Sequence, residues 1–356
     1  MATNPRVYIN GKFLCQQATG VQKFAHGLSQ ALQAKHPEII VIMPKGKHSH
    51  RGLMVKEFGY GQGFFWEQIW LPLFLWFHPH TILLSFCNTA PLLIKKQIVT
   101  IHDLAFRKNK DWFSASFRLW YNFLIPRLCK RSLQIISVSE FSKQEICKAY
   151  GVSSNKIHVV PNSVPLMEYD AQRPYPFPYL LLTGIFNPRK NAAFVFSLLP
   201  EIKKKGYHIV GIGLEANIFG KTTFPKDENV HILNAVDDRQ YYTLMKHAEA
   251  LVFPSEYEGF GIPVLEALVL GTPAIVPDVA VYRESFGDIP LYYAAGDAEM
   301  LLKALDTIKF HKPTTNSVDY LKNKFNFDAA GNILADIIHK TLAPNKNHHN
   351  RHNSSQ

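Results

Sequence analysis

The sequence predicts an α/β protein of two domains, each built on a parallel sheet that helices cover. Its 356 residues, of which 47% are hydrophobic, suffice for two cores of ordinary size. Short apolar runs alternate with helical stretches, a rhythm typical of parallel sheets. The rhythm stops at RPYPFPY (173–179), where three prolines exclude a helix or a central strand. We interpret this segment as the linker between the domains.

The first half contains five runs with the length and composition of strands, and two helical patterns. The helices cover 20–35 and 141–151, and the second ends on Gly151, a residue suited to a helix C-terminus. The predicted strands are VYIN (7–10), IIVIMP (39–44), TILLSF (81–86), QIVTIHD (97–103) and QIISVSE (134–140).

The second half continues the alternation, without a short repeat that would indicate a solenoid. Helical patterns cover 190–206 and 239–249, and a third begins at Pro263 and ends before Gly271. The predicted strands are YLLLTGIF (179–186), HIVGIG (208–213), NVHILNAV (229–236), ALVFP (250–254) and TPAIVP (272–277).

Composition argues against several classes of protein. The four cysteines lie far apart without a Cys-x-x-Cys pair, so neither a zinc cluster nor a disulfide framework is expected. The N-terminus lacks a positive region followed by an apolar run, which predicts no signal peptide. The most hydrophobic window, 64–77, is shorter than the about 20 residues of a spanning helix and contains Glu67 and Pro72.

The formal net charge of +11 indicates an anionic partner, such as a nucleotide sugar, a lipid headgroup or nucleic acid. Much of this charge lies in segment 106–131, where basic and aromatic residues mix. Such a segment suits the surface of an anionic membrane. The alternative is a helical region whose aromatic side chains pack inward while its charges are solvated.

The segment FPSEYEGFGIPVLEAL (253–268) combines a strand end, a glycine-containing loop and the start of a helix. Ligands of open α/β sheets bind beyond the carboxyl ends of the strands, and a helix N-terminus there favours an anion. Gly259 and Gly261 let the backbone approach a phosphate, while Glu258 and Glu266 are acceptors for sugar hydroxyls. This combination indicates a sugar nucleotide as the ligand.

The same segment resembles the acidic signature of retaining glycosyltransferases of family four, which have the GT-B fold. Two glutamates separated by seven residues carry the match. The resemblance implies that Glu258 faces the hydroxyls of the donor sugar and that Glu266 holds the nucleotide ribose. It also implies donor contacts from the loop residues Gly259, Phe260, Gly261 and Ile262.

TGIFNPRKN (183–191) is similar to the family's loop that grips the donor diphosphate. The resemblance implies this role for Gly184, Arg189 and Lys190, and cations there suit a diphosphate leaving group. Ile185 departs from the pattern, because many members have an arginine directly after the glycine.

Two further segments of the first half resemble the family. GKFLCQQATGVQKFAHGL is similar to its N-terminal loop near the donor phosphates; Gly20 matches, while Gln22 replaces a second glycine. QIVTIHDLAF places His102, next to Asp103, where the family's histidine approaches the donor sugar.

The resemblance extends from about residue 6 to 285 and implies the GT-B fold, two Rossmann-like domains that face each other across a cleft. We expect the acceptor domain at 1–172 and the donor domain at 173–315. A helical segment at 316–343 would return to the first domain, and residues 344–356 read as a disordered tail.

The implied reaction transfers a hexose, with retention, from a nucleotide diphosphate sugar to a saccharide or a lipid-linked saccharide. We expect no cofactor and no metal ion, because no Asp-x-Asp pair is placed at the donor site. The Pro-Arg-Lys-Asn loop resembles members that use GDP-mannose to build bacterial surface polysaccharides, lipopolysaccharide among them. We therefore expect a cytoplasmic enzyme, with peripheral contact at the inner membrane and no nucleic-acid partner.

Other classes of protein were weighed. A nicotinamide dehydrogenase needs a Gly-x-Gly-x-x-Gly turn after its first strand, which VYINGKFLCQQATG lacks. A nucleic-acid-binding protein fits the charge but leaves Glu258 and Glu266 unexplained. A catalytically silent subunit that binds a sugar nucleotide is the third alternative.

Overall fold

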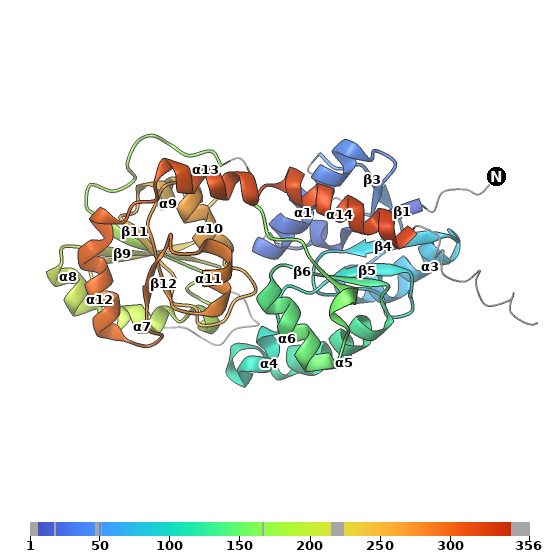
Figure 1. The fold of residues 1–356 in the computed structure, drawn as a ribbon, viewed down its shortest axis with the longest axis horizontal. Coiled ribbons are helices and arrows are strands. Elements are labelled where there is room, and N and C mark those ends of the chain that lie inside the picture. The colour runs from blue at the N-terminus through green and yellow to red at the C-terminus, as the bar shows by residue number, and fades with distance from the viewer. Residues whose placement is uncertain are drawn as a thin grey trace, which may run out of the picture.

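The computed structural model describes residues 6–17, 19–46, 50, 52–165, 167–214 and 224–342. Two α/β domains lie side by side, each with one sheet between helices (Figure 1). Every strand pair within the two sheets is parallel. The predicted fold class of two parallel α/β domains is confirmed. The predicted tail, 344–356, lies outside the described residues.

The N-terminal sheet has seven strands in the order β3-β2-β1-β4-β5-β6-β7. The order reverses between β1 and β4, which makes a switch point where ligands of such sheets bind. The strands are β1 (Arg6–Asn10), β2 (Ile40–Met43), β3 (Val55–Glu57), β4 (Thr81–Ser85), β5 (Gln97–Thr100), β6 (Gln134–Ser137) and β7 (Ile157–Val159).

The helices of this domain begin and end at residues with suitable local chemistry. At the start of α1 the Gln22 side chain accepts a hydrogen bond from the backbone N–H of Thr19 (3.2 Å), and α6 ends at Gly151 with φ 63°. The helices are α1 (Gly20–Lys35), α2 (Gly63–Phe65), α3 (Leu71–Trp76), α4 (Ala105–Lys108), α5 (Ala115–Arg131) and α6 (Glu140–Tyr150). Shorter turns are η1 (Gly11–Cys15), the π-helix η2 (Trp66–Trp70), η3 (Lys110–Trp112) and η4 (Ser154–Lys156).

The C-terminal sheet has six strands in the order β10-β9-β8-β11-β12-β13, with its own switch point between β8 and β11. Its strands are β8 (Tyr179–Thr183), β9 (His208–Gly213), β10 (Val230–Asn234), β11 (Ala250–Val252), β12 (Ala274–Pro277) and β13 (Leu291–Tyr293). Its helices are α7 (Ala192–Phe196), α8 (Leu199–Lys204), α9 (Asp238–His247), α10 (Ile262–Val269), α11 (Ala280–Phe286) and α12 (Ala298–Thr307), with the short turns η5 (Pro188–Lys190) and η6 (Ile308–Phe310).

The last two helices run along the same edge of both domains (Figure 1). Helix α13 (Thr315–Lys324) contributes Leu321 to the C-terminal core, where Phe325 follows it. Helix α14 (Phe327–Leu342) lies against α1, and the Phe327 ring occupies the space that a side chain at Gly27 would fill. The chain therefore crosses back to the N-terminal domain between residues 325 and 327.

All ten predicted strands are present; most of them, such as β4 and β8, are apolar runs buried on both faces of a sheet, whereas the edge strand β10 is only partly buried. The sequence missed β3, β7 and β13, which are three-residue edge strands, too short to show a periodicity. The helix predicted at 190–206 is divided into α7 and α8, and Pro200 lies at the start of the second. Window 64–77 folds as α2, η2 and α3, and no helix among the described residues is long and apolar enough to cross a membrane.

Candidate active site

A cavity of about 580 Å³ lies between the two domains and is lined by both. Its walls come from the carboxyl ends of the central strands and from the loops that follow them, at both switch points. The eleven residues singled out in the sequence all line it: Gly20, His102, Gly184, Arg189, Lys190, Glu258, Gly259, Phe260, Gly261, Ile262 and Glu266. The tertiary structure thus brings together loops that lie up to 246 positions apart in the chain.

A second hollow, of about 710 Å³, lies in the C-terminal domain between the linker and α9. It is lined by residues such as Asp170, Arg173 and Arg239, which are exposed, and by none of the residues singled out above. Its ion pair between Arg239 and Asp170 joins the linker to α9 on the surface. We therefore assign the chemistry to the cavity between the domains.

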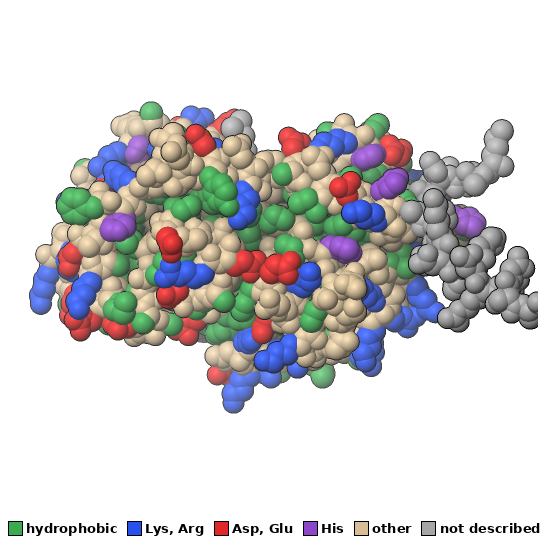
Figure 2. Space-filling view, viewed as in Figure 1, with side chains coloured by type: hydrophobic (Ala, Val, Ile, Leu, Met, Phe, Trp, Pro, Cys, Tyr) green, Lys and Arg blue, Asp and Glu red, His purple; other side chains and the backbone are tan. Residues whose placement is uncertain are grey.

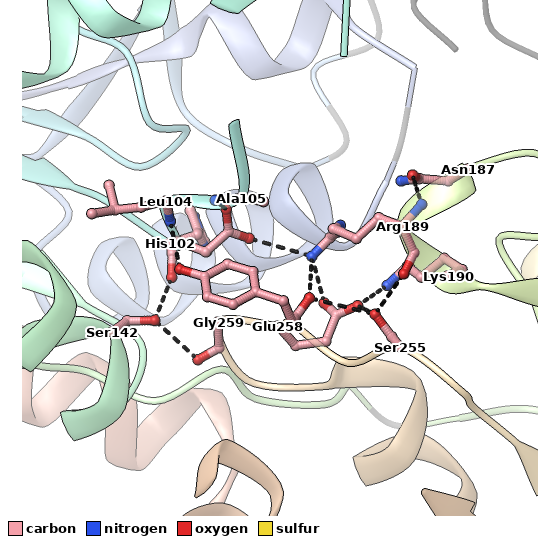
Figure 3. Close-up of polar contacts among 12 residues, drawn as sticks. His102, Leu104, Ala105, Ser142, Asn187, Arg189, Lys190, Ser255, Glu258 and Gly259 are labelled. Carbon is pink, nitrogen blue, oxygen red and sulfur yellow. Dashed lines mark hydrogen bonds and ion pairs between the residues drawn. The ribbon is translucent and has the colours of Figure 1, made fainter. Parts of the chain in front are cut away.

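Glu258 is the centre of a buried ionic cluster in the cleft (Figure 3). Its carboxylate accepts hydrogen bonds from Arg189 Nη1 (2.9 Å), Lys190 Nζ (2.6 Å) and Ser255 Oγ (2.6 Å). Both cations come from η5, where the Asn187 side chain accepts a hydrogen bond from the backbone N–H of Arg189 (3.1 Å). The loop after β8 and the loop after β11 therefore hold each other in place.

Electrostatics keep the Glu258 carboxylate ionised. Burial on its own raises the pKa of this group, but the charges of Arg189 and Lys190 outweigh burial, and the pKa lies below its ordinary value. The cluster also includes Asp103, whose Oδ2 is 3.6 Å from Arg189 Nη1. Two cations and two carboxylates thus balance one another within the cleft.

The loop that carries Glu258 is fastened to the N-terminal domain. The backbone N–H of Leu104 donates to Tyr257 Oη (3.2 Å), and Ser139 Oγ donates to the carbonyl of Gly259 (2.6 Å). With the pair between Asp103 and Arg189, these contacts link the carboxyl edges of the two sheets. The two domains are therefore in contact across the cleft, and we call this arrangement the closed state.

The requirement for glycine in this loop has two different physical causes. A Cβ atom at Gly259 would lie 2.2 Å from the carbonyl oxygen of His102, so this glycine permits contact between the domains. Gly261 has φ 101°, a left-handed conformation that disfavours other residues, and it stands at the N-cap of α10. The sequence attributed both glycines to a close phosphate approach, but at Gly259 the backbone of the other domain occupies the space beside Cα.

Gly20 and Gly184 are likewise placed by close contacts. A Cβ atom at Gly20 would lie 3.0 Å from Ile262 Cδ1 of the other domain. Gly184 has φ 70° and lies under the Lys190 side chain. Both glycines thus allow the loops around the cavity to approach one another.

His102 is buried and held in one tautomer. Its Nε2 is 2.8 Å from the carbonyl oxygen of Phe86, which can only accept, so Nε2 carries the proton. Its backbone N–H donates to Asn88 Oδ1 (2.7 Å), and its ring packs edge-on against Phe24. Burial lowers the pKa, partly offset by the Phe86 hydrogen bond and by Asp103. The imidazole is therefore neutral near pH 7, and Nδ1 is a hydrogen-bond acceptor.

Glu266 lies in the second turn of α10 and is held by two tyrosines. Tyr241 Oη donates to Oε2 (2.8 Å) and Tyr242 Oη donates to Oε1 (3.1 Å). Burial raises the pKa of this carboxyl group, and Lys23 and the tyrosine hydrogen bonds offset the rise only in part. Lys23, from α1 of the other domain, pairs with Asp238 (2.6 Å).

Three polar groups that line the cavity have no hydrogen-bond partner within the part of the chain described. They are Thr183 Oγ1 at the end of β8, Asn162 Oδ1 and Arg189 Nε, and all three atoms are buried. Buried polar groups rarely remain unpaired in a functioning protein. At the N-terminus of α10, Pro263 has no N–H and Val264 donates to the Gly261 carbonyl (3.0 Å), so among the described contacts the N–H of Ile262 is the helical donor left for a ligand. The cavity therefore offers unused donors and acceptors to a polar ligand.

Sequence reasoning missed several residues in and behind the wall of the cavity. The sequence predicts only a helix over Tyr241 and Tyr242, since nothing in RQYYTLMKHAE shows that it lies against Glu266. Glu67 interrupts an apolar window, which was a signal of a buried partner, and the structure pairs it with Lys12 (2.8 Å). Among the residues covered by the structure, no three His, Cys, Asp or Glu side chains are grouped to hold a metal ion. Metal independence stays a prediction.

Family models match both domains. The model of "Glycosyl transferases group 1" matches residues 171–319, which include η5 and the loop with Glu258. The model of "Glycosyltransferase Family 4" matches residues 18–168, which include His102. The chain belongs to the glycosyltransferases of family 4. The resemblance inferred from the acidic and basic loops is confirmed, whereas the absence of a nucleic-acid partner stays a prediction.

Two named relatives of this glycosyltransferase are O-antigen chain mannosyltransferases of bacteria. It is 28% identical over 266 residues to the O-antigen chain mannosyltransferase RfbU of Salmonella typhimurium, an alignment that covers 70% of this chain and 72% of the relative. It is 23% identical over 231 residues to O-antigen chain mannosyltransferase B of Escherichia coli, covering 59% of this chain and 60% of the relative.

Solved structures share the fold of this glycosyltransferase at low identity. Sucrose-phosphate synthase from Thermosynechococcus elongatus matches with a TM-score of 0.70 at 15% identity, covering 95% of this chain and 99% of that chain. Anabaena Alr3699/HepE in complex with UDP-glucose matches with a TM-score of 0.70 at 13% identity, covering 94% and 99%. The GT-B fold expected from the sequence is confirmed.

Proposed function

We propose that this glycosyltransferase transfers a hexose, with mannose as the first choice, from a nucleotide diphosphate sugar to a hydroxyl of a saccharide or lipid-linked saccharide. We further propose that the product is a cell-surface polysaccharide and that the anomeric configuration is retained. One observation carries the proposal. Glu258 and Glu266 lie buried in one cavity, the first beside two cations and the second beside two tyrosines, with the N-terminus of α10 between them.

The donor diphosphate would bind at η5 and the N-terminus of α10. Arg189 and Lys190 now share the carboxylate of Glu258. A diphosphate carries more negative charge than this one carboxylate, so it would compete for both cations. Release from them would free Glu258 to accept hydrogen bonds from hydroxyls of the donor sugar.

The nucleoside would lie against Glu266. A carboxylate that two tyrosine hydroxyls hold in place is preorganised to accept from a ribose diol, whose hydroxyls would replace or share those donors. Thr183 and Asn162, whose oxygens have no partner in the described structure, are further contacts for this ligand.

The chemical step follows from these contacts. The bond between the anomeric carbon and the phosphate oxygen breaks, and its electron pair remains on the diphosphate, which Arg189 and Lys190 stabilise. The acceptor oxygen bonds to the anomeric carbon from the same face, and its proton passes to the leaving phosphate. The family resemblance implies that Glu258 accepts hydrogen bonds from the sugar hydroxyls and does not attack the anomeric carbon, so we propose no double displacement. His102 Nδ1 would accept a hydrogen bond from the donor sugar.

The identity of the donor rests on chemistry and on relatives of modest similarity. Two relatives are named O-antigen chain mannosyltransferases, which supports mannose and, with the Pro-Arg-Lys-Asn loop, GDP-mannose. Anabaena HepE, similar in fold, is described in complex with UDP-glucose, so UDP-sugars are the competing donors. We also propose that the two cations of η5 replace a metal ion; activity that EDTA abolishes would contradict this.

We also propose a peripheral contact with an anionic membrane through the N-terminal domain. Lys and Arg side chains gather along the lower edge of this domain in Figure 2, over α4 to α6. Phe64 packs on Trp120 of α5, with ring centroids 4.3 Å apart, so α2 and α5 form one surface. Exposed apolar side chains of this region are Phe64, Phe65, Trp76, Phe77, Leu119 and Phe123. Basic charge beside exposed aromatic rings suits lipid headgroups.

The donor proposal is tested by thermal shift with GDP, UDP, ADP, dTDP and their sugar conjugates, followed by turnover of the sugar nucleotide that binds. A ligand at a hundredfold excess over its dissociation constant adds about 2.7 kcal/mol of apparent stability, a shift of several degrees. We expect one nucleotide family to shift the wild type and to lose its effect in Glu266→Ala. Binding without turnover would identify a catalytically silent subunit, and no shift with any of these ligands would refute the donor site.

A further inference from the structure

The N-terminal half of the cavity contains a polar cluster that the donor site does not use. Glu67 is the centre of this cluster and is 1% exposed. Its Oε1 accepts from Asn10 Nδ2 (2.8 Å) and Thr89 Oγ1 (3.0 Å), and its Oε2 accepts from Lys12 Nζ (2.8 Å). Lys12 and Thr89 line the cavity, while Glu67 and Asn10 lie behind them.

Elements that end at the switch point of the N-terminal sheet build this cluster. Asn10 ends β1, and its side chain accepts a hydrogen bond from the backbone N–H of Lys12 (3.2 Å). This hydrogen bond caps the start of the turn η1. Glu67 comes from the π-helix η2, a rare irregularity that frequently marks a functional site. Glu67 thus holds Lys12 and Thr89 in position, and these two side chains face the cavity.

The charge of the cluster selects the kind of ligand. Lys12 and Glu67 neutralise each other at 2.8 Å, so this half of the cavity presents no net charge, in contrast to an anion site of unpaired cations. Of the three N–H donors of Lys12, the described residues use two, with Glu67 and Thr89 as acceptors. The third is available to a neutral hydroxyl.

Asn88 adds a second polar group beside Lys12. It has φ 60°, a conformation uncommon outside glycine and typical of functional sites. Its Oδ1 accepts from the backbone N–H of His102, which fixes the amide next to the donor-sugar residue. Asn88 lines the same cavity as Lys12 and His102.

An aromatic wall lines the same part of the cavity as Lys12, Asn88 and Thr89. Phe113, Phe117 and Tyr121 stack in a row, with ring centroids 5.0 Å and 4.0 Å apart, and all three line the cavity. Phe117 and Tyr121 are one helical turn apart on α5. A sugar ring has apolar C–H faces and a rim of hydroxyls, which match such a wall and such a set of donors and acceptors.

We propose that Lys12, Asn88, Thr89 and the wall of Phe113, Phe117 and Tyr121 form the acceptor subsite, and that this subsite takes an uncharged terminal sugar of the acceptor. The inference rests on the proposed function, because it assigns the second substrate of the same reaction. Lys12, Asn88 and Thr89 bind hydroxyls of that sugar, and the row of Phe113, Phe117 and Tyr121 packs against the C–H groups of its ring. Glu67 is a positioning residue that acts through Lys12.

The test uses methyl glycosides of mannose, glucose, galactose and N-acetylglucosamine as acceptors, with the donor found by thermal shift. The variants are Phe117→Ala and the double variant Lys12→Met/Glu67→Gln, which removes both charges and so leaves no buried charge unpaired. Matched controls are Leu93→Ala, an exposed apolar residue of the same domain, and Lys95→Met on the surface. Each variant is measured for KM of the glycoside, for kcat and for the thermal shift with donor.

We expect at least one glycoside to accept the sugar, and both test variants to raise its KM at least tenfold with the donor-induced thermal shift retained. The controls keep the wild-type KM. A wild type that binds and turns over donor but accepts none of the glycosides, an unchanged KM in both variants, or a preference for mannose 6-phosphate over methyl mannoside would overturn the inference. Absence of any donor shift in the wild type would instead refute the proposed function.

Discussion

Gly259→Ala tests whether closure of the cleft supports activity. The new Cβ atom would lie 2.2 Å from the carbonyl oxygen of His102, whereas real contacts of Cβ atoms essentially never fall below 3.0 Å. The loop with Glu258 must therefore retreat by at least 0.8 Å, the difference between these two distances. The hydrogen bond from Ser139 Oγ to the Gly259 carbonyl, now 2.6 Å, would lengthen or break.

The expected cost follows from the cause. Overpacking of a tight contact costs about 1–3 kcal/mol. Here the clash lies between the loop after β11 and the loop after β5, which belong to different domains, so the cost falls on the closed arrangement. At 1.4 kcal/mol per factor of ten, the closed population drops by about 5- to 150-fold relative to the open one. We expect kcat/KM to fall by a similar factor, while the free energy of unfolding changes less.

The assay measures two quantities for the variant and for the wild type: kcat/KM for the donor, and the radius of gyration from small-angle X-ray scattering. Gly151→Ala is the control, because Gly151, unlike Gly259, has a positive φ (63°), and a side chain there meets open space at the end of α6 instead of the other domain. We expect the control to lose about 1 kcal/mol of stability without loss of kcat/KM. A Gly259→Ala enzyme with wild-type kcat/KM and radius of gyration would refute the reasoning.

Three further predictions address charge. Glu258→Gln leaves Arg189 and Lys190 without their carboxylate; we expect kcat to fall at least a hundredfold, and wild-type turnover would show that Glu258 has no role in the reaction. The pKa of Glu266 is raised above its ordinary 4.5, so its contribution to stability is present at low pH and is lost as the pH rises through the folded pKa. Between pH 4.5 and 8, urea denaturation should therefore show a smaller loss of unfolding free energy for Glu266→Gln than for the wild type. The exposed Glu168→Gln should lose as much as the wild type. Parallel curves for wild type and Glu266→Gln would exclude the effect. Finally, α5 carries four basic residues to neutralise together, namely Arg118, Arg127, Lys130 and Arg131. This change should reduce binding to vesicles of phosphatidylglycerol and spare nucleotide binding. Unchanged vesicle binding would show that these residues are only solvated and do not contact the membrane.

The sequence predicted much of the fold because most strands are buried on both faces and therefore appear as continuous apolar runs. The edge strands β3, β7 and β13 escaped, since three residues carry no periodicity. Helix α14 lies within the helical segment predicted at 316–343, but its contact with α1 comes from a close fit of Phe327 at Gly27 that no local pattern records.

The loops of the candidate site were also readable from the sequence, because the residue types themselves carry the chemistry. Carboxylates at positions 258 and 266, cations at 189 and 190, and a glycine before a helix are unusual together, and each follows a predicted strand. Their role toward a donor stays a prediction for the experiments above.

Tertiary structure alone decided which of these groups meet and in which state. The pairing of Glu258 with Arg189 and Lys190, the tyrosines that hold Glu266, and the tautomer of His102 depend on distances between loops that different strands deliver to one edge. The same holds for Gly259, whose missing side chain admits the backbone of the other domain. Sequence patterns reflect local burial and residue chemistry, whereas charge state and contact between domains arise from long-range packing, which has no local signature.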